Sequence, residues 1–159
     1  MSAATQLRSL WERLSHIPGG KALFSTLFGV LVPYSGTIRP RVLSLAPGRA
    51  TIAMADRHGV RNHLNSVHAI ALMNLAEMTT GLAIAYAQPD TGRGIITGLS
   101  IEYVKKARGR LVATVDVEPP DFGERRELDV PVEIRDDAGE LVARATARWL
   151  LGPIEASSS

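Results

Sequence analysis

The sequence of 159 residues contains no cysteine, which excludes a disulfide scaffold, a thiolate nucleophile and any cysteine-based metal site. Aromatic residues are also scarce, with three Phe, three Tyr and two Trp, so there are few stacking platforms for nucleic-acid bases. The longest apolar run is interrupted too often to span a bilayer, and the N-terminus lacks the pattern of a secretory signal. We therefore expect a cytoplasmic protein that binds no nucleic acid and has no membrane span.

Several common catalytic motifs are absent as well. The segment Gly98–Glu102 lacks the second glycine of a nucleophile elbow and falls in a strand pattern, which argues against a serine triad. No glycine-rich phosphate loop opens a helix after a strand, so a nucleotide-binding fold is not supported. His58, His63 and His68 recur every five residues, which is not a zinc-binding spacing. We expect no metal and no cofactor, so catalysis must use oxygen or nitrogen groups.

The composition is that of an ordinary globular protein, with 45% hydrophobic and 21% charged residues. The length suits one domain with a sizeable core, which we place over residues 1–159. Within it we expect N-terminal helices at 1–33, a core at 36–151 and a frayed tail at 152–159. The net charge is +2, and basic residues cluster only at 105–110, where they form either a solvated strand end or a site for a ligand phosphate.

The order of predicted elements indicates an α+β fold. Apolar spacings predict helices at 3–16 and 21–32, the second stopping at Pro33, and a long helix at about 67–87. Alternating patterns predict six strands, at 36–45, 49–55, 95–104, 111–117, 126–134 and 140–151. The links between successive strands are short, which favours antiparallel pairing.

The last strand suggests how the sheet and the long helix pack. Ala143, Ala145 and Ala147 share one face with Leu141 and Trp149, and this row of small side chains leaves space for a helix backbone. The helix at 67–87 is the one long enough to fill that space, so we expect a curled antiparallel sheet wrapped around it. Pro131 removes a ladder donor and is therefore predicted at a sheet edge or a bulge.

Glu77 places a carboxylate in the middle of this otherwise apolar helix. Burying an ionised carboxylate is costly unless it is paired or its pKa is raised, so Glu77 is either a structural acid or a chemical group. Asn74, Thr80 and Gly81 lie three or four residues away and form a polar and small seam beside it. A buried carboxylate with a raised pKa can serve as a base or a nucleophile.

His68 lies nine residues before Glu77, which is about half a turn out of phase at about 100° per residue. It belongs near the helix start, where Asn65 or Ser66 can cap the helix and backbone N–H groups can polarise a carbonyl oxygen. Together with Glu77 this outlines acyl-transfer chemistry. The structural alternatives are a hydrogen-bonding role for His68 and a left-handed turn for Asn62.

In these residues the sequence resembles the hotdog-fold acyl-CoA thioesterases, especially the phenylacetic-acid-pathway type and a related uncharacterised thioesterase-like group with N-terminal helices. In that family a loop Asn is followed six residues later by His-Gly-Gly at the start of the central helix, and an Asp or Glu follows the His by nine. Asn62, His68 and Glu77 keep both spacings, whereas Ala69-Ile70 replaces the glycine pair. The segment Tyr103–Gly109 is similar to the family's strand leading into Pro-Ala-x-x-Gly.

The resemblance implies a hotdog fold that hydrolyses acyl-CoA and forms a homodimer or homotetramer with its sites between subunits. Glu77 is then the base or nucleophile, and Asn62 and His68 complete the catalytic set. The expected substrate-binding residues are Ala69, Ile70, Asn74, Thr80, Lys105, Lys106 and Arg108. A non-catalytic acyl-CoA- or lipid-binding hotdog protein is the alternative, suggested by the replaced glycines. An acyl-CoA hydratase fits less well, because its usual Asp-His pair is missing at matching positions.

Overall fold

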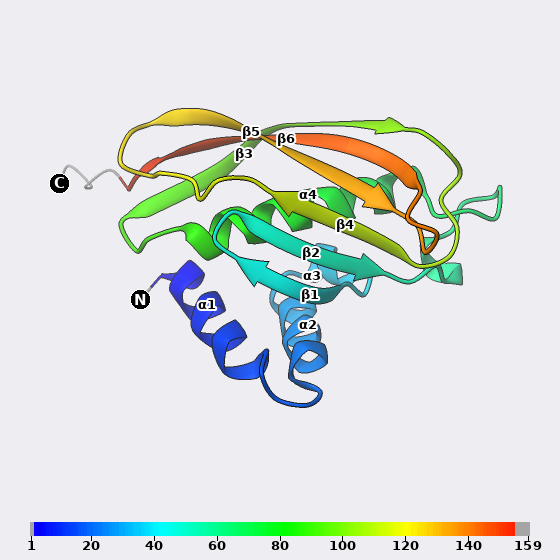
Figure 1. Cartoon of the computed structure of the whole chain (residues 1–159), viewed down its shortest axis with the longest axis horizontal. Helices are drawn as coiled ribbons and strands as arrows, with labels where there is room; N and C mark the ends of the chain where they lie inside the picture. Colours follow the sequence, from blue (N-terminus) through cyan, green and yellow to red (C-terminus); the bar gives the residue numbers. More distant parts are fainter. Residues whose placement is uncertain (1, 155–159) are drawn as a thin grey trace.

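The computed structural model describes residues 2–154 (Figure 1). Its helices are α1 (Ala3–Leu14), α2 (Gly20–Leu31), α3 (Pro33–Gly36) and α4 (Ala69–Ala87), with a short 3-10 turn at His58–Val60. Its strands are β1 (Arg41–Ala46), β2 (Arg49–Met54), β3 (Gly92–Tyr103), β4 (Leu111–Asp116), β5 (Arg126–Arg135) and β6 (Leu141–Pro153).

The six strands form one antiparallel sheet in the order β1-β2-β4-β5-β6-β3. The sheet curls over α4, which contacts all six strands, while α1 packs against α4 and α2 packs against β1 (Figure 1). This confirms the predicted sheet wrapped around one long helix. β3 is an edge strand, so its outer side has no strand partner among residues 2–154.

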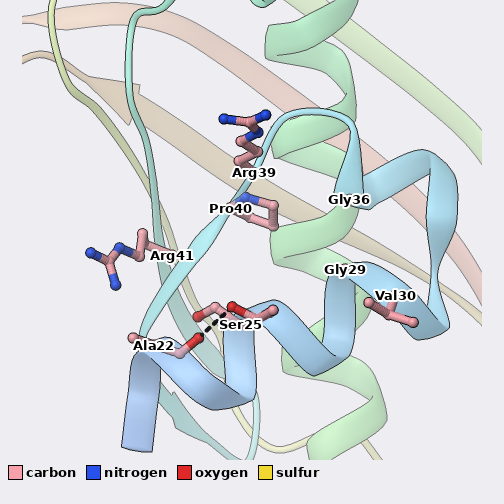
Figure 2. A pocket seen from close by; sticks show the side chains of 9 residues that line it. Ala22, Ser25, Gly29, Val30, Gly36, Arg39, Pro40 and Arg41 are labelled. Atoms are coloured by element: carbon pink, nitrogen blue, oxygen red, sulfur yellow. Dashed lines mark hydrogen bonds between the residues drawn. The ribbon is translucent and has the colours of Figure 1, made fainter. Parts of the chain in front are cut away.

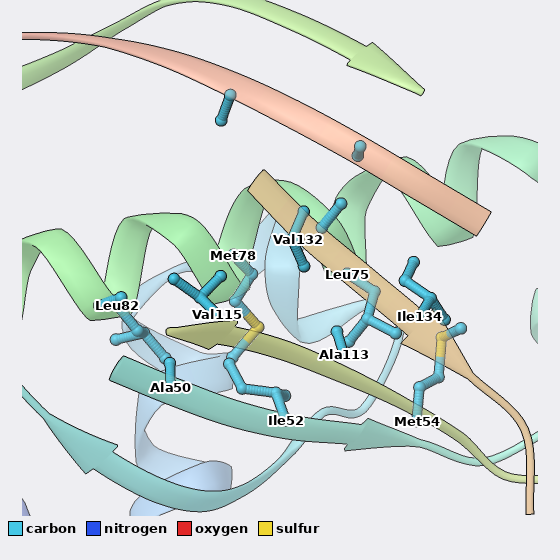
Figure 3. Packing of buried hydrophobic residues seen from close by; sticks show 14 of the residues in the cluster. Ala50, Ile52, Met54, Leu75, Met78, Leu82, Ala113, Val115, Val132 and Ile134 are labelled. Atoms are coloured by element: carbon cyan, nitrogen blue, oxygen red, sulfur yellow. The ribbon is translucent and has the colours of Figure 1, made fainter. Parts of the chain in front are cut away.

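The core lies between α4 and the concave face of the sheet. Figure 3 shows Leu75, Met78 and Leu82 of α4 packed against side chains from β2, β4 and β5, which include Ala50, Ile52, Met54, Ala113, Val115, Val132 and Ile134. The alanine row of β6 is buried as predicted, at Ala143, Ala145 and Ala147. By length and composition α4 could cross a membrane, but the sheet encloses it and makes it the core helix.

The N-terminal helices form a second layer. Trp11 of α1 meets Phe24 of α2 edge to face, with ring centroids 5.0 Å apart, and Phe24 is almost fully buried. The approach of α3 to α2 is closer still, because a Cβ on Gly36 would stand 2.2 Å from the carbonyl oxygen of Gly29. Only glycine fits at position 36 without moving the backbone, so this pair fixes how α3 lies on α2.

Two boundary predictions were wrong. The extended segment predicted from residue 36 begins only at Arg41, because Pro33 starts a short helix instead of merely ending the one before it. Residues 152 and 153 belong to β6, where Gly152 pairs with Arg93 and Pro153 with Gly92, so this part of the predicted tail is ordered in the sheet. The rest of that tail, at 155–159, lies outside the described residues.

Pro131 was also misplaced. It lies on β5, an interior strand, and pairs with Thr146 of β6. The ladder between β4 and β5 ends at Thr114 and Glu133, so Pro131 has no β4 partner and its missing N–H interrupts no hydrogen bond there. The proline is tolerated because the sheet has already opened on that side.

Candidate functional site

One stripe of α4 is left open by both layers. Ile70, Met73, Glu77 and Gly81 lie along it and are half-exposed or exposed, in contrast to buried neighbours such as Leu72, Ala76 and Thr80. On one side the stripe is bordered by α3, where the Asn74 side chain donates to the carbonyl oxygen of Tyr34 at 3.1 Å. The stripe therefore exposes the central helix at the surface of a single chain.

The sheet borders the other side of the stripe. The Tyr103 hydroxyl of β3 donates to the carbonyl oxygen of Ala69 at 3.1 Å, and the Trp149 indole of β6 donates to the Thr80 hydroxyl at 3.2 Å. The edge strand thus lies beside the start of α4. β3 exposes apolar side chains near both of its ends, including Ile95 and Tyr103, which are 49% and 46% exposed.

Glu77 occupies the middle of the open stripe. Its side chain is half-buried, and its carboxylate forms no hydrogen bond or ion pair within residues 2–154. Burial raises the pKa of the Glu77 carboxyl above its ordinary value of 4.5. The ionised form of Glu77 is therefore not stabilised by a hydrogen bond or an ion pair from the described part of the chain, and the carboxylate accepts a proton more readily than an ordinary carboxylate does.

The predicted seam beside Glu77 is present only in part. Gly81 borders the carboxylate, because a Cβ there would stand 3.8 Å from Oε1 of Glu77. Thr80 is fully buried and donates to the backbone carbonyl of Glu77 at 2.9 Å, so it turns toward β6. Asn74 turns toward α3. Neither polar side chain contacts the carboxylate.

The helix start is capped by His68, so the predicted cap by Asn65 or Ser66 was wrong. Nδ1 of His68 accepts from the N–H of Ile70 at 3.0 Å, which assigns the imidazole proton to Nε2. The next two N–H groups donate to the carbonyl oxygen of His68. In the first turn this leaves the N–H of Ala69 without an acceptor among residues 2–154.

Asn62 organises the loop before α4. Its carbonyl oxygen Oδ1 accepts from the N–H of Leu64 at 3.0 Å and from the N–H and hydroxyl of Ser66 at 3.2 Å each. The left-handed residue in this loop is Asn65, with φ of 56°, instead of Asn62. The side-chain NH₂ of Asn62 has no acceptor in the described part of the chain, so it remains able to donate.

Asp56 holds this loop against the segment after β3. It accepts from Nε of Arg61 at 2.6 Å and from the backbone N–H of Gly109 at 3.0 Å. The Arg61 hydrogen bond lowers the pKa of Asp56, despite an opposing effect of burial. A backbone hydrogen bond from Val67 to Ala107, 2.8 Å long, adds a second tie.

The basic segment 105–110 therefore lies beside the loop. Its three predicted binding residues differ in whether their charge is already paired with an acid. Lys105 forms ion pairs with Asp136, at 2.6 Å, and with Glu140, so its charge is already partnered. Lys106 and Arg108 are exposed and form no ion pair within residues 2–154. Those two remain the candidates for contact with a ligand phosphate.

A cleft of about 400 Å³ opens at the start of α4, and it brings together His68, Ile70 and Asn74 from the predicted set. Sequence reasoning missed its other walls, which come from α3 and from the segments around it: Tyr34, Thr37, Ile38, Gly59, Val60, Arg61 and Ala71. The proline at the start of α3 was the signal that could have located Tyr34. Glu77 does not line this cleft.

The helix start and Glu77 are separated along α4 within one chain. Ala69 and Glu77 are eight residues apart, which places their backbones about 12 Å apart along the helix axis. A carbonyl bound by the Ala69 N–H is therefore distant from the carboxylate of the same chain. The structure brings together the helix start, the loop and the cleft, and it leaves Glu77 on the adjoining open stripe.

The curled sheet around α4 is a hotdog fold, and known structures share it. A structural-genomics crystal structure is 31% identical with a TM-score of 0.81, covering 96% of this chain and 100% of that one. A probable thioesterase from Pseudomonas aeruginosa is 21% identical with a TM-score of 0.70, covering 82% and 91%. A variant of a thioesterase enzyme from Staphylococcus aureus is 17% identical with a TM-score of 0.68, covering 76% and 99%.

The family follows from the sequence itself. Residues 20–151 match the family described as Domain of unknown function (DUF4442), and the chain therefore belongs to the DUF4442 family. The match begins at α2 and ends within β6, so it includes α4 and all of the sheet except the last two residues of β6. No curated protein sequence matches the chain.

Proposed function

We propose that this protein hydrolyses acyl thioesters, with acyl-CoA as the substrate class and Glu77 as base or nucleophile. The observation that carries the proposal is the Glu77 carboxylate, which is half-buried on the open stripe, has no partner in residues 2–154 and has a raised pKa. The fold supports the same class, because it is shared with proteins described as thioesterases. A base with a raised pKa is better matched to neutral pH than an ordinary carboxylate.

The reaction needs one base, one water and one polarised carbonyl. Glu77 takes a proton from water as the water oxygen bonds to the thioester carbon, and the carbonyl electron pair moves onto its oxygen. The Ala69 N–H stabilises that oxyanion at the positive end of α4. When the carbonyl reforms, the C–S bond breaks, and the sulfur leaves with the electron pair and receives the proton from Glu77. Direct attack by Glu77, giving an anhydride that water cleaves, is the second route.

A second copy of the chain completes the site in this proposal. Twofold pairing of the open stripes would run the two α4 helices antiparallel and bring Glu77 of one copy beside the helix start of the other. Met73 lies midway between Ala69 and Glu77 in the sequence and on the same stripe, so the axis passes near it. The unpaired edge of β3 and its exposed apolar side chains support the same contact.

The activity is tested by thiol release from purified protein with short-chain, long-chain and aromatic acyl-CoAs. We expect turnover of at least one of them and a loss of about 100-fold or more in Glu77→Gln, the scale of general-base catalysis. Glu118→Gln is the matched control, because Glu118 is exposed in the loop after β4. An unchanged rate in Glu77→Gln would remove Glu77 from the mechanism.

The pairing is tested by Met73→Cys, which introduces the only cysteine into a chain that has none. Two copies whose residue-73 Cα atoms lie within about 7 Å across the axis can form a disulfide on mild oxidation. We expect a crosslinked dimer on a non-reducing gel, and none from Thr114→Cys on the outer face of β4. A monomer from both variants would contradict the proposed axis.

The alternative is an acyl-CoA- or lipid-binding protein without turnover. It is favoured by the helix start, where Ala69 and Ile70 carry side chains and the N–H of Ile70 is already bonded to His68. Fewer free donors at this position would weaken stabilisation of an oxyanion. Tight acyl-CoA binding without thiol release across all chain lengths would establish this alternative over the enzyme.

A further inference from the structure

The helix α2 is apolar on two opposite faces. Its inner face packs Phe24 into the core, whereas Leu23, Leu27 and Val30 form an outer stripe that is 49%, 38% and 71% exposed. Their spacing of four and three residues places them in line on one side of the helix. α2 packs against β1, α1 and α3 at the periphery of the molecule (Figure 1), and the exposure of the outer stripe shows that these side chains face solvent.

Positive charge flanks the outer stripe. A hollow of about 420 Å³ separates α2 from the segment Arg39–Arg41, with Val30 and both arginines among its lining residues (Figure 2). Neither guanidinium group forms a hydrogen bond or ion pair within residues 2–154. Lys21, at the start of α2, donates to the carbonyl oxygen of Leu43 and forms no ion pair within residues 2–154.

The charge is asymmetric over the whole chain. Residues 1–54 contain six Lys and Arg and a single acid, Glu12, for a net charge of +5. Residues 55–159 contain twelve Lys and Arg and fifteen acids, for a net charge of −3. Because no acid occurs between Glu12 and Asp56, the elements around the outer stripe have no acidic residue of their own except on α1.

Arg39 is held in an unfavourable backbone conformation. Its φ is 49°, in the left-handed region that glycine adopts at little cost and that other residues rarely occupy. The conformation keeps a cation at the rim of the hollow where glycine would be easier for the backbone. Strain retained at a surface arginine without a partner is typical of a binding residue.

We propose that the outer stripe of α2, with Arg39 and Arg41, docks on the surface of an anionic lipid bilayer. Leu23, Leu27 and Val30 enter the interface between headgroups and acyl chains, and the arginines meet lipid phosphates. A second copy on this face is disfavoured, because a twofold contact would set the same cations against each other without an acid to pair them. The stripe is the convex side of a helix. A partner helix would dock in a groove, whereas a convex surface can rest on a flat bilayer.

The test is co-sedimentation of the full chain with vesicles of phosphatidylcholine alone and of phosphatidylcholine mixed with phosphatidylglycerol. We expect binding to the mixed vesicles that weakens as salt is raised, and little binding to the neutral vesicles. Val30→Glu should reduce the partition coefficient about tenfold, because it inserts a charge into the docking stripe. Arg144→Gln removes a cation from the outer face of β6 and should leave binding unchanged.

Arg39→Gly distinguishes a loss of membrane docking from a loss of folded protein. Glycine relieves the backbone conformation, so the melting temperature should stay at or above that of the original chain while vesicle binding falls several-fold. The proposal is overturned if anionic vesicles bind no better than neutral ones, or if Val30→Glu and Arg39→Gly bind like the original chain. It is also overturned if Val30→Glu changes the oligomeric state in sedimentation velocity and the original chain binds no vesicles.

Discussion

Glu77 and Gly81 lie one turn apart on the open stripe of α4, and the glycine leaves the space beside the carboxylate unfilled. A Cβ at residue 81 would stand 3.8 Å from Oε1 of Glu77 and 3.5 Å from the Trp149 ring, both ordinary contact distances. Alanine would therefore fit at residue 81. It would also make the helix more stable, because glycine in the middle of a helix is less favourable than alanine. Gly81 therefore lowers the stability of the helix at a position that adjoins the Glu77 carboxylate.

Gly81→Ala should consequently raise the free energy of unfolding by about 0.5–1 kcal/mol, the difference in helix propensity. We expect it also to lower thioester turnover several-fold, since the added methyl group narrows the space beside Glu77. Denaturant unfolding and thiol release measure the two effects on the same sample. A gain in stability with full activity would mean that the space beside the carboxylate has no role in the reaction.

The pKa of Glu77 makes a prediction for stability against pH. A raised pKa means that the folded chain holds the proton more tightly than the unfolded chain does. The free energy of unfolding must therefore fall as the pH rises from about 4.5 through the raised pKa. Glu77→Gln lacks this loss, so its stability advantage over the original chain should grow as the pH rises from about 4.5 through the raised pKa of Glu77. Parallel stability curves for the two proteins would show that Glu77 titrates normally.

His68 has a structural role that two substitutions separate from a chemical one. His68→Ala removes the helix cap and should cost about 1 kcal/mol of stability, whereas His68→Asn supplies a good cap and should cost little. If the imidazole serves the reaction, as the sequence predicts, both variants lose activity. Full activity in His68→Asn would leave His68 as a cap alone.

If the basic segment binds the phosphates of CoA, substitutions in it should change KM but not kcat. Lys106→Gln and Arg108→Gln should raise KM for acyl-CoA with little change in kcat, because phosphates lie far from the reacting carbonyl. A thioester of N-acetylcysteamine, which has no phosphate, is the control substrate and should show no change. Lys105→Gln breaks ion pairs to Asp136 and Glu140, so it should alter stability more than KM. Equal effects on both substrates would contradict phosphate binding.

Much of the fold could be predicted because the spacing of hydrophobic residues indicates which side chains of a helix or strand are buried. The strong alternation in β6 and the continuous apolar character of α4 identified the sheet and the central helix. The errors arose where one residue type has two local roles. Pro33 can end a helix or begin one, and the contact between Gly29 and Gly36 that settles the choice is not visible in the sequence.

The candidate site was harder to predict than the fold. The position of Glu77 on α4 followed from its apolar neighbours, but its surroundings depend on which way each side chain turns. Thr80 and Asn74 have the spacing of partners for Glu77, yet each is taken by a tertiary hydrogen bond, to Trp149 and Tyr34. Lys105 likewise pairs with acids from a hairpin that is distant in sequence.

The central proposal is that Glu77 of one copy acts with the helix start of another, where the free NH₂ group of Asn62 orients the water or the substrate. Asn62→Asp is the matched variant, because it keeps the acceptor oxygen that organises the loop and replaces the NH₂ donor with a charged carboxylate oxygen, which cannot donate. Co-expression of Asn62→Asp and Glu77→Gln chains with different tags allows the mixed dimer to be purified. Each mixed dimer contains one unaltered site if the site is shared, and none if each chain builds its own.

The decisive measurement is thiol release by that mixed dimer, compared with both parent variants and the original protein. We predict about half of the original activity per dimer, since one of two symmetric sites is intact, while each parent is nearly inactive. A mixed dimer no more active than its parents would contradict a site shared between copies.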